Sequence, residues 1–332
     1  MDRTGAALSK AGIESIPMRL TLLFFCFFAL LYAEVYPVDI TPEQPHKTYR
    51  DQTFGSVRIL DQKEIILESI GGIRFAEASD LAYDSKKQRL YMVGDKGVLY
   101  IFKALFSDKI ETLSPLHAYR LTKEKGRHFR KKVDSEGLTL DEQGNLLISF
   151  ERKPKIGTFA TQGERITRHK LPHPLSNRKH YRSTNKMLES VALHPQYGIL
   201  TASEFPLKRH KLHYQTLYAL SGKQWHFLAE PERKSAVTAI EVMDDGNLLV
   251  LERAYTKLTE PRTITLKKLY LDHPNQGLHP SKVLLKMPSD KGWRNDNFEG
   301  LTKIAPHRYL MVSDDNNNFF QRTLLIYFEV VE

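Results

Sequence analysis

The chain has 332 residues, of which 41% are hydrophobic and 27% charged, so it can bury a substantial core in one large domain or two ordinary ones. One cysteine excludes a disulfide scaffold, and no pattern of a nucleic-acid-binding module is present. The formal net charge of +10 favours anionic partners such as phosphates, lipid head groups or polyanions.

The N-terminal region contains an apolar run from Leu20 to Tyr32. A run of about 13 residues is typical of a secretory signal and too short to span a bilayer. We predict a signal peptide over residues 1–33, cleaved after Ala33, with Met18 as an alternative start. Cleavage would remove Cys26 and leave no membrane span, which suits a periplasmic or secreted protein. An uncleaved N-terminal anchor is the alternative.

A repeated pattern runs along the rest of the chain. Each copy has a short apolar run, a polar turn, a second apolar run and, at its end, a carboxylate, which together indicate a β-hairpin. Roughly 50–60 residues separate successive copies, as expected for blades of a β-propeller. We therefore predict an all-β propeller domain over residues 34–332. The five copies are Ser79 to Asp95, Glu136 to Glu151, Glu189 to Glu204, Thr238 to Glu252, and Glu299 to Asp314.

Outer strands are expected after the hairpins, for example at Val98–Phe102 and Leu266–Leu271. The strand-like stretch Ser56–Phe75 either adds a sixth blade or closes the ring with the C-terminal strand Thr323–Val331. We favour six blades over five. A β-sandwich with coincidental hairpins is the alternative.

The two ends of each hairpin should lie side by side at its open end. Because the first strand of a propeller blade is innermost, all the open ends should meet at one mouth of the central channel. Clustered carboxylates must be neutralised by metal, by Lys or Arg, or by protonation, and oxygen ligands favour Ca²⁺. The alternative is that the same carboxylates form salt bridges that lock blades together. The predicted metal ligands are Glu136, Glu189, Glu299, Glu151, Glu204, Glu252 and Asp314.

Basic residues precede three of the repeats and favour a phosphate-binding rim at the same mouth. Solvated surface loops are the alternative. Catalytic residues stay unassigned, because the sequence contains neither G-x-S-x-G nor H-E-x-x-H. The predicted substrate-binding residues are Arg127, Arg130, Lys132, Arg182 and Arg294.

Several of these segments also resemble a known family. Asp134–Leu138, Asn297–Leu301 and Val312–Asn317 resemble the phytase-like domain of bacterial exported proteins, described as "esterase-like activity of phytase". The resemblance covers about residues 70–330. It implies a propeller that hydrolyses phosphate or carboxylate esters.

The functional hypothesis is an exported, monomeric, metal-dependent phosphoesterase or esterase that acts on a small anionic or phosphorylated substrate. A lactonase- or esterase-type propeller that accepts neutral esters is a narrower version. The alternative is a non-catalytic propeller that binds a protein, a glycan or an anionic component of the cell envelope. Nucleic acid is not expected as a partner.

Overall fold

The computed structural model describes residues 34–43, 48–129, 133–255, 260–272, 274 and 276–331. The chain divides into residues Met1–Leu31 and Tyr32–Glu332, and all described residues belong to the second unit. The predicted signal peptide therefore lies outside the described residues. None of the described helices is long and apolar enough to cross a membrane.

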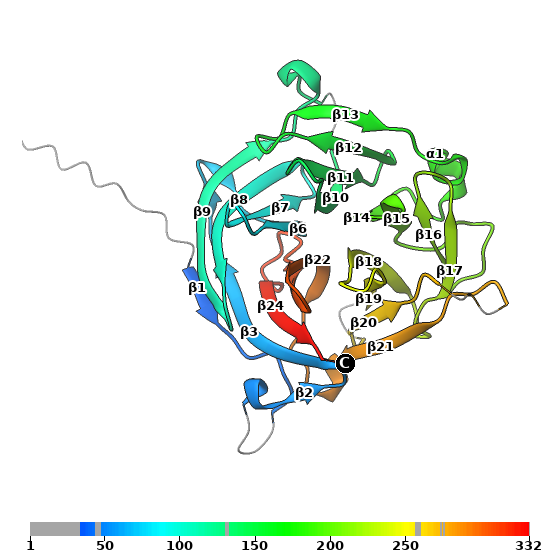
Figure 1. Cartoon of the computed structure of the whole chain (residues 1–332). Coiled ribbons are helices and arrows are strands. Elements are labelled where there is room, and N and C mark those ends of the chain that lie inside the picture. The colour runs from blue at the N-terminus through cyan, green and yellow to red at the C-terminus, as the bar shows by residue number, and fades with distance from the viewer. Residues whose placement is uncertain are drawn as a thin grey trace, which may run out of the picture. The chain divides into compact units, whose positions relative to one another are not determined.

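Four four-stranded antiparallel sheets follow one another along the chain and stand around a central channel (Figure 1). In each sheet the strands run in sequence order, with the first strand innermost. The first blade holds β6 (Ala78–Asp84), β7 (Arg89–Gly94), β8 (Val98–Phe106) and β9 (Ile110–Arg120). The second holds β10 (Ser135–Leu140), β11 (Leu146–Phe150), β12 (Lys155–Phe159) and β13 (Arg165–His169). The third holds β14 (Leu188–His194), β15 (Gly198–Ser203), β16 (Tyr214–Ala219) and β17 (Gln224–Leu228). The fourth holds β18 (Ser235–Val242), β19 (Leu248–Ala254), β20 (Thr263–Leu269) and β21 (Ser281–Pro288).

The fifth blade joins the two ends of the described chain. Its C-terminal strands are β22 (Asn297–Ala305), β23 (Arg308–Asp314) and β24 (Thr323–Val330). Its N-terminal strands are β3 (Val57–Ile66), β1 (Glu34–Pro37) and the short β2 (Thr53–Phe54). β3 pairs antiparallel with β24 along its length, with Ile326 opposite Gln62.

Six blades are not confirmed, since the described residues form five. The stretch Ser56–Phe75 closes the ring instead, because β3 covers the otherwise unpaired edge of β24. Between β3 and β6 only β4 (Ser69–Ile70) and β5 (Ile73–Arg74) remain, a hairpin too short for a blade.

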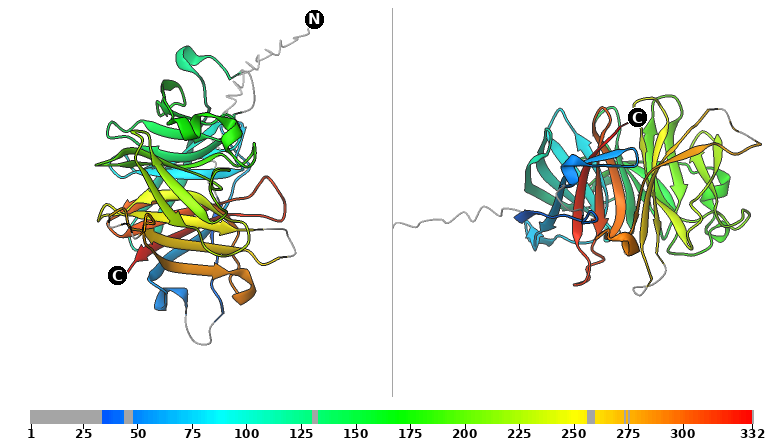
Figure 2. Two further views of the ribbon diagram at one scale, coloured as in Figure 1. Left: turned by 90° about the vertical axis from the view of Figure 1, so that its right-hand side faces the viewer. Right: turned by 90° about the horizontal axis from the view of Figure 1, so that it is seen from below.

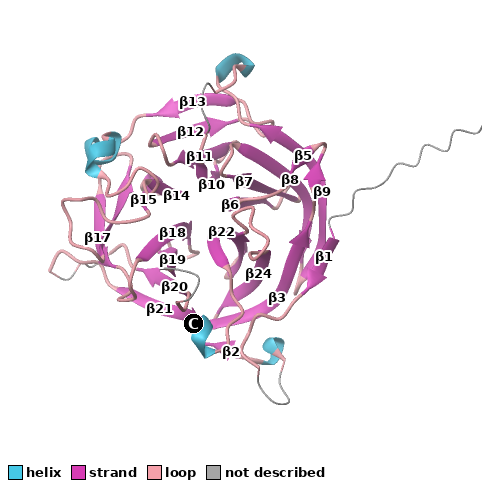
Figure 3. Ribbon diagram, turned by 180° about the vertical axis from the view of Figure 1, so that it is seen from behind, coloured by secondary structure: helices cyan, strands magenta, loops and turns pink. Residues whose placement is uncertain are grey.

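Short helices lie at the edge of the ring, and strands connected by loops form the rest (Figure 3). They are α1 (His173–Ser176), η1 (Tyr49–Asp51), η2 (Glu124–Gly126), η3 (Arg178–His180) and η4 (Ser289–Lys291). Seen edge-on in Figure 2, the strands of each blade run between the two faces of the ring.

The hydrophobic core lies between neighbouring blades. Trp225 and Leu217 of the third blade, for example, pack in one cluster with Val250 and Leu269 of the fourth. Both faces of each sheet are thus covered, which explains why the strands are apolar almost throughout.

Every inner hairpin contains a β-bulge near the start of its first strand. The pairing register shifts there in all five blades, and the shift falls at Ser79, Glu136, Glu189, Thr238 and Glu299. A bulge turns the affected side chain out of the regular alternation. In three of the five blades the bulged residue is a glutamate that lines the cavity described below.

Two glycines directly after the bulges allow the inner strands to approach closely. A Cβ on Gly137 would lie 2.6 Å from the backbone nitrogen of Val191 in the next blade. A Cβ on Gly300 would lie 2.7 Å from the Cα of Asp80. Asp80 is itself buried and accepts N–H bonds from Leu138 (2.7 Å) and Leu301 (2.9 Å), which ties three blades together at the axis.

Candidate functional site

A cavity of about 510 Å³ opens at the mouth where the innermost strands begin. Its lining combines many acidic side chains with few basic ones. The carboxylates come from four blades and are Asp95, Asp134, Glu136, Glu151, Glu189, Glu204, Glu299 and Asp314. The basic residues are Arg152, Lys186 and Arg253. The cavity therefore holds five more carboxylates than basic groups among the described residues.

Two positions of the hairpins supply seven of the eight carboxylates in this lining. One is the bulged residue of the first strand. The other lies on the second strand, one residue after the partner of the residue that precedes the bulge. In the third blade these residues are Glu189 and Glu204, because the pair before the bulge is Leu188 with Ser203. The second and fifth blades repeat the arrangement, with Glu136 and Glu151 and with Glu299 and Asp314.

The fourth blade departs from this arrangement, and Glu252 lies outside the cavity. The pair before its bulge is Val237 with Glu252, so the position that faces the cavity falls on Arg253. Glu252 is buried in an ion pair with Lys267, whose Nζ lies 2.5 Å from Oε1, and it accepts a hydrogen bond from the Ser235 hydroxyl (3.0 Å). The prediction that Glu252 is a metal ligand is therefore not supported by its position.

The basic residues of the cavity neutralise only some of its carboxylates. Arg253 pairs with Glu299 and, through Nη2, with Oε1 of Glu204 at 3.2 Å. Nζ of Lys186 lies 2.7 Å from the same Oε1 of Glu204. Nε of Arg152 lies 2.6 Å from Oδ2 of Asp134.

Glu136 and Glu189 have no such partner. Each is only 8% exposed and lines the cavity, yet neither accepts a hydrogen bond nor pairs with a basic group in the described part of the chain. Burial, and then the charge of Glu189, holds the pKa of Glu136 well above its usual range. Burial, and then the charge of Glu204, does the same to the pKa of Glu189. Two buried acids that face a cavity without an ion pair could be neutralised by a bound cation or by protonation.

The neighbouring carboxylates have raised pKa values too, although they accept hydrogen bonds. Burial raises the pKa of Glu151 to about 8, and this carboxylate accepts the Met187 N–H at 3.2 Å. Burial raises the pKa of Asp95 to about 7, and the Ser79 hydroxyl donates to it at 2.7 Å. Burial holds the pKa of Asp314 well above its usual range.

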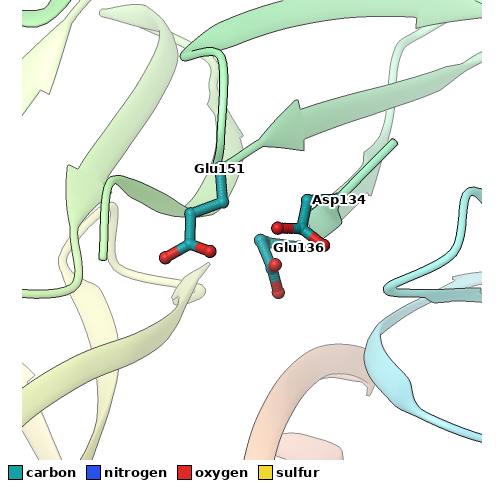
Figure 4. Close-up of side chains that lie close together, drawn as sticks. All are labelled: Asp134, Glu136 and Glu151. Atoms are coloured by element: carbon teal, nitrogen blue, oxygen red, sulfur yellow. The ribbon is translucent and has the colours of Figure 1, made fainter. Parts of the chain in front are cut away.

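Two groups of carboxylates are close enough to hold a metal ion. Asp134, Glu136 and Glu151 form one group, whose side chains lie together in Figure 4, and Glu151, Glu189 and Glu204 form the other. Within each group the ligand atoms lie within 4.8 Å of one another. Because bonds from Ca²⁺ to oxygen are about 2.3–2.6 Å long, each group is compact enough that it could hold one ion.

Asp134 was not among the predicted ligands. Its signal in the sequence is its place directly before Ser135 and Glu136, in one of the segments that carry the family resemblance.

The family described as "Phytase-like: Esterase-like activity of phytase" matches residues 73–317. The chain belongs to this phytase-like family. The matched segment contains every carboxylate of the cavity and confirms the resemblance stated from the sequence. No curated protein matches the chain in sequence.

Solved structures that resemble this phytase-like propeller are distant. The β-propeller domain of Cps50 (Swd1) from Myceliophteria thermophila is 13% identical, covers 78% of this chain and 98% of its own, and has a TM-score of 0.38. A luciferin-regenerating enzyme is 11% identical, with coverages of 77% and 92% and a TM-score of 0.41. Virginiamycin B lyase from Staphylococcus aureus is 8% identical, with coverages of 90% and 99% and a TM-score of 0.41. Likeness at this level carries no argument about activity.

Of the basic residues predicted to bind substrate, the three that the structure describes do not line the cavity of this phytase-like propeller. Arg127 is exposed and donates to the Glu124 carbonyl (3.3 Å). Arg182 donates to the Pro206 carbonyl (2.9 Å), and Arg294 lies 3.5 Å from Glu43. Their loops turn them towards nearby backbone and surface groups. Arg130 and Lys132 lie outside the described residues.

Proposed function

We propose that this phytase-like propeller is an exported, metal-dependent hydrolase of small phosphate or carboxylate esters, with Ca²⁺ bound in the central cavity. The observation that carries the proposal is the pair of buried glutamates, Glu136 and Glu189, which line the cavity without an ion pair or a hydrogen bond among the described residues. The expected location is the periplasm or the extracellular space, and the expected state is a monomer.

The ligand set favours a hard cation. Asp134, Glu136, Glu151, Glu189 and Glu204 offer only carboxylate oxygens, which suit Ca²⁺ better than Zn²⁺ or Cu²⁺. Glu151 belongs to both groups, so it would sit at the centre of the metal-binding region. A bound Ca²⁺ would offset the carboxylate charge and polarise an ester oxygen.

Basic side chains offer contacts for the substrate. The side chains of Lys186 and Arg152 are 41% and 52% exposed, so they are open to a ligand that enters from solvent. Arg253 lies deeper, with its side chain 12% exposed. Guanidinium and ammonium groups bind phosphate and carboxylate oxygens through charge-assisted hydrogen bonds, and the cavity volume is within the range of small-molecule sites.

The lining limits the chemistry of the reaction. Among the described residues that line the cavity, none is Ser, Thr, Cys or His, so no side-chain nucleophile with a histidine base is present. Water is therefore the proposed nucleophile. In a phosphate ester its oxygen bonds to the phosphorus and the P–O bond to the alcohol breaks. In a carboxylate ester its oxygen bonds to the carbonyl carbon and the acyl C–O bond breaks. In both cases the alcohol leaves with a proton from the water.

A second candidate is a non-catalytic propeller that binds a protein, a glycan or an anionic envelope component. The observation that favours it is that Arg253 of the fourth blade already pairs with Glu204 of the third and Glu299 of the fifth, as expected if the mouth mainly holds the blades together.

The test compares Ca²⁺ binding and ester hydrolysis in the same samples. We expect calorimetry to show Ca²⁺ binding, and p-nitrophenyl phosphate or an aryl acetate to be hydrolysed only with Ca²⁺ present. The double variant Glu136→Gln/Glu189→Gln should lose both. Glu142→Gln, in the exposed turn after β10, removes a carboxylate elsewhere and should lose neither.

The outcomes separate the candidates. Ca²⁺ binding without turnover of phosphomonoesters, phosphodiesters or aryl esters would favour the non-catalytic propeller. Absence of Ca²⁺ binding would overturn the proposed metal site itself.

A further inference from the structure

A second cavity, of about 310 Å³, lies in the third blade, away from the carboxylates of the channel mouth. It is formed by α1 and η3, which precede β14, and by the loop that follows β15; α1 lies at the periphery of the ring in Figure 1. Its lining contains no carboxylate among the described residues. The lining residues are His173, Pro174, Lys179, His180, Leu207, Lys208 and Arg209.

The positive charges of this cavity are uncompensated. Within the described chain, no ion pair involves Lys179, Lys208 or Arg209, although basic and acidic residues are paired in many other places. Arg209 is held by neutral acceptors: Nε donates to Nε2 of His210 (3.0 Å) and Nη2 to Oε1 of Gln224 (3.3 Å). These hydrogen bonds hold the guanidinium in place without neutralising its charge, so the charge is available to an anionic ligand.

The two segments that carry these charges are tied to each other. The backbone N–H of Lys208 donates to the carbonyl of His180 at 2.8 Å, which joins the loop after β15 to η3. Nδ1 of His180 bonds to the Pro174 carbonyl at 2.8 Å, which joins η3 to α1. The basic groups are thus held around one space by a connected backbone rather than spread over independent loops.

The wall between these charges is apolar. Leu207 is 1% exposed and Pro174 lies beside it in the lining, while the rings of His173 and His180 contact each other with centroids 5.7 Å apart. A cavity lined by both apolar and cationic residues matches a ligand that has an apolar body and an anionic head.

We propose that this cavity binds a small amphipathic anion, with its apolar or aromatic body against Leu207, Pro174 and the imidazole rings. Its phosphate or carboxylate head would be held by Lys179, Lys208 and Arg209, because such groups form charge-assisted hydrogen bonds with oxyanions. The site is separate from the acidic cavity and needs no metal ion. The proposal therefore stands independently of the proposed hydrolase activity.

The test uses phenyl phosphate as the probe, titrated calorimetrically into the full chain after removal of divalent cations, so that a metal in the acidic cavity contributes nothing. We expect saturable binding of phenyl phosphate at one site. Phenol, which lacks the charge, and inorganic phosphate, which lacks the apolar body, should each bind at least about tenfold more weakly.

The key variant is Lys208→Gln/Arg209→Gln, which should weaken binding of phenyl phosphate by about tenfold or more. The matched control is Arg178→Gln/Lys211→Gln, which removes the same charge from exposed residues of the same two segments that do not line the cavity. Binding by the control should stay within about twofold of the unmodified chain.

A second experiment distinguishes a lipid head group from a soluble anion as the ligand. Co-sedimentation with phosphatidylcholine vesicles that contain phosphatidic acid, lost in Lys208→Gln/Arg209→Gln, would identify a lipid head group as the ligand; binding of phenyl phosphate alone would identify a soluble anion. Either result supports the site. Equal losses in the key and control variants, equal affinity for phenyl phosphate and phenol or inorganic phosphate, or no binding in either arm would overturn it.

Discussion

Arg253 and Glu204 occupy equivalent positions in neighbouring blades, and their side chains form an ion pair with Nη2 3.2 Å from Oε1. The fourth blade thus contributes a cation where the others contribute carboxylates. Since Arg253 also pairs with Glu299, the acids next to the fourth blade are neutralised within the protein. Glu136, Glu151 and Glu189 remain on the side of the cavity where we propose that a cation binds.

The first prediction concerns this internal cation. Arg253→Gln would leave Glu204 and Glu299 with less counter-charge in a buried place and should lower the free energy of unfolding of the metal-free protein by about 3 kcal/mol. Arg152→Gln removes a half-exposed partner of Asp134 and should cost less than about 1 kcal/mol. Urea unfolding in the presence of a chelator measures both. Equal effects would contradict the assigned role of Arg253.

The second prediction separates two glutamates that the sequence pattern treats alike. Glu151→Gln should weaken Ca²⁺ binding by at least about tenfold, because Glu151 belongs to both carboxylate groups. Glu252→Gln should leave Ca²⁺ affinity within about twofold, because Glu252 pairs with Lys267 outside the cavity. Calorimetric titration gives both values, and a comparable loss in the two variants would refute the distinction.

The difference between these glutamates also shows how far the sequence can lead. The repeat predicted the gathering of carboxylates at one mouth, since hairpin geometry carries the bulged residue and the end of the second strand to the same place. Glu252 is the terminal carboxylate of the fourth repeat, but it does not lie at the position that faces the cavity. That position is Arg253, which follows Thr238 at the spacing that separates Glu136 from Glu151 and Glu189 from Glu204.

Other features depend on contacts between residues far apart in the sequence or on loop conformations, which a local sequence pattern does not reveal. The blade number is decided by the pairing of β3 with β24, whose residues lie at opposite ends of the described chain. The places of Arg127 and Arg182 depend on loop conformations that bring them to the Glu124 and Pro206 carbonyls. Clusters of Lys and Arg in the sequence therefore predicted a basic rim, but they did not predict which of these side chains line the cavity.

The third prediction concerns pH. Burial raises the pKa of Asp95 from an ordinary value of 3.8 to about 7 and that of Glu151 from 4.5 to about 8. The folded metal-free protein therefore keeps protons that the unfolded chain has lost, and the resulting stabilisation is full below about pH 4 and is lost as pH rises through 7 and 8. The Tm in chelator should fall over this range.

Two measurements check the cause of this fall. Excess Ca²⁺ should restore the Tm at pH 8, because the ion replaces the protons on the carboxylates. Asp95→Asn/Glu151→Gln should make the fall in chelator less steep, since neither amide titrates. A Tm in chelator that rises between pH 5 and pH 8 would contradict the raised pKa values.

The fourth prediction concerns the close approach of the inner strands. Gly137→Ala and Gly300→Ala each place a Cβ against the backbone of another blade, which cannot move aside as a flexible side chain does. Each should lower the free energy of unfolding by about 1–3 kcal/mol or more. Chemical denaturation that shows no loss for either alanine variant would contradict this packing.

The most direct test of the metal site is a crystal structure of the protein grown with Ca²⁺ and phosphate. The account predicts an ion about 2.4 Å from carboxylate oxygens of Glu151 and of Glu136 or Glu189, with phosphate oxygens between the ion and Lys186, Arg152 or Arg253. A cavity that holds only water at saturating Ca²⁺, with Glu136 and Glu189 sharing hydrogen bonds as protonated acids, would contradict it.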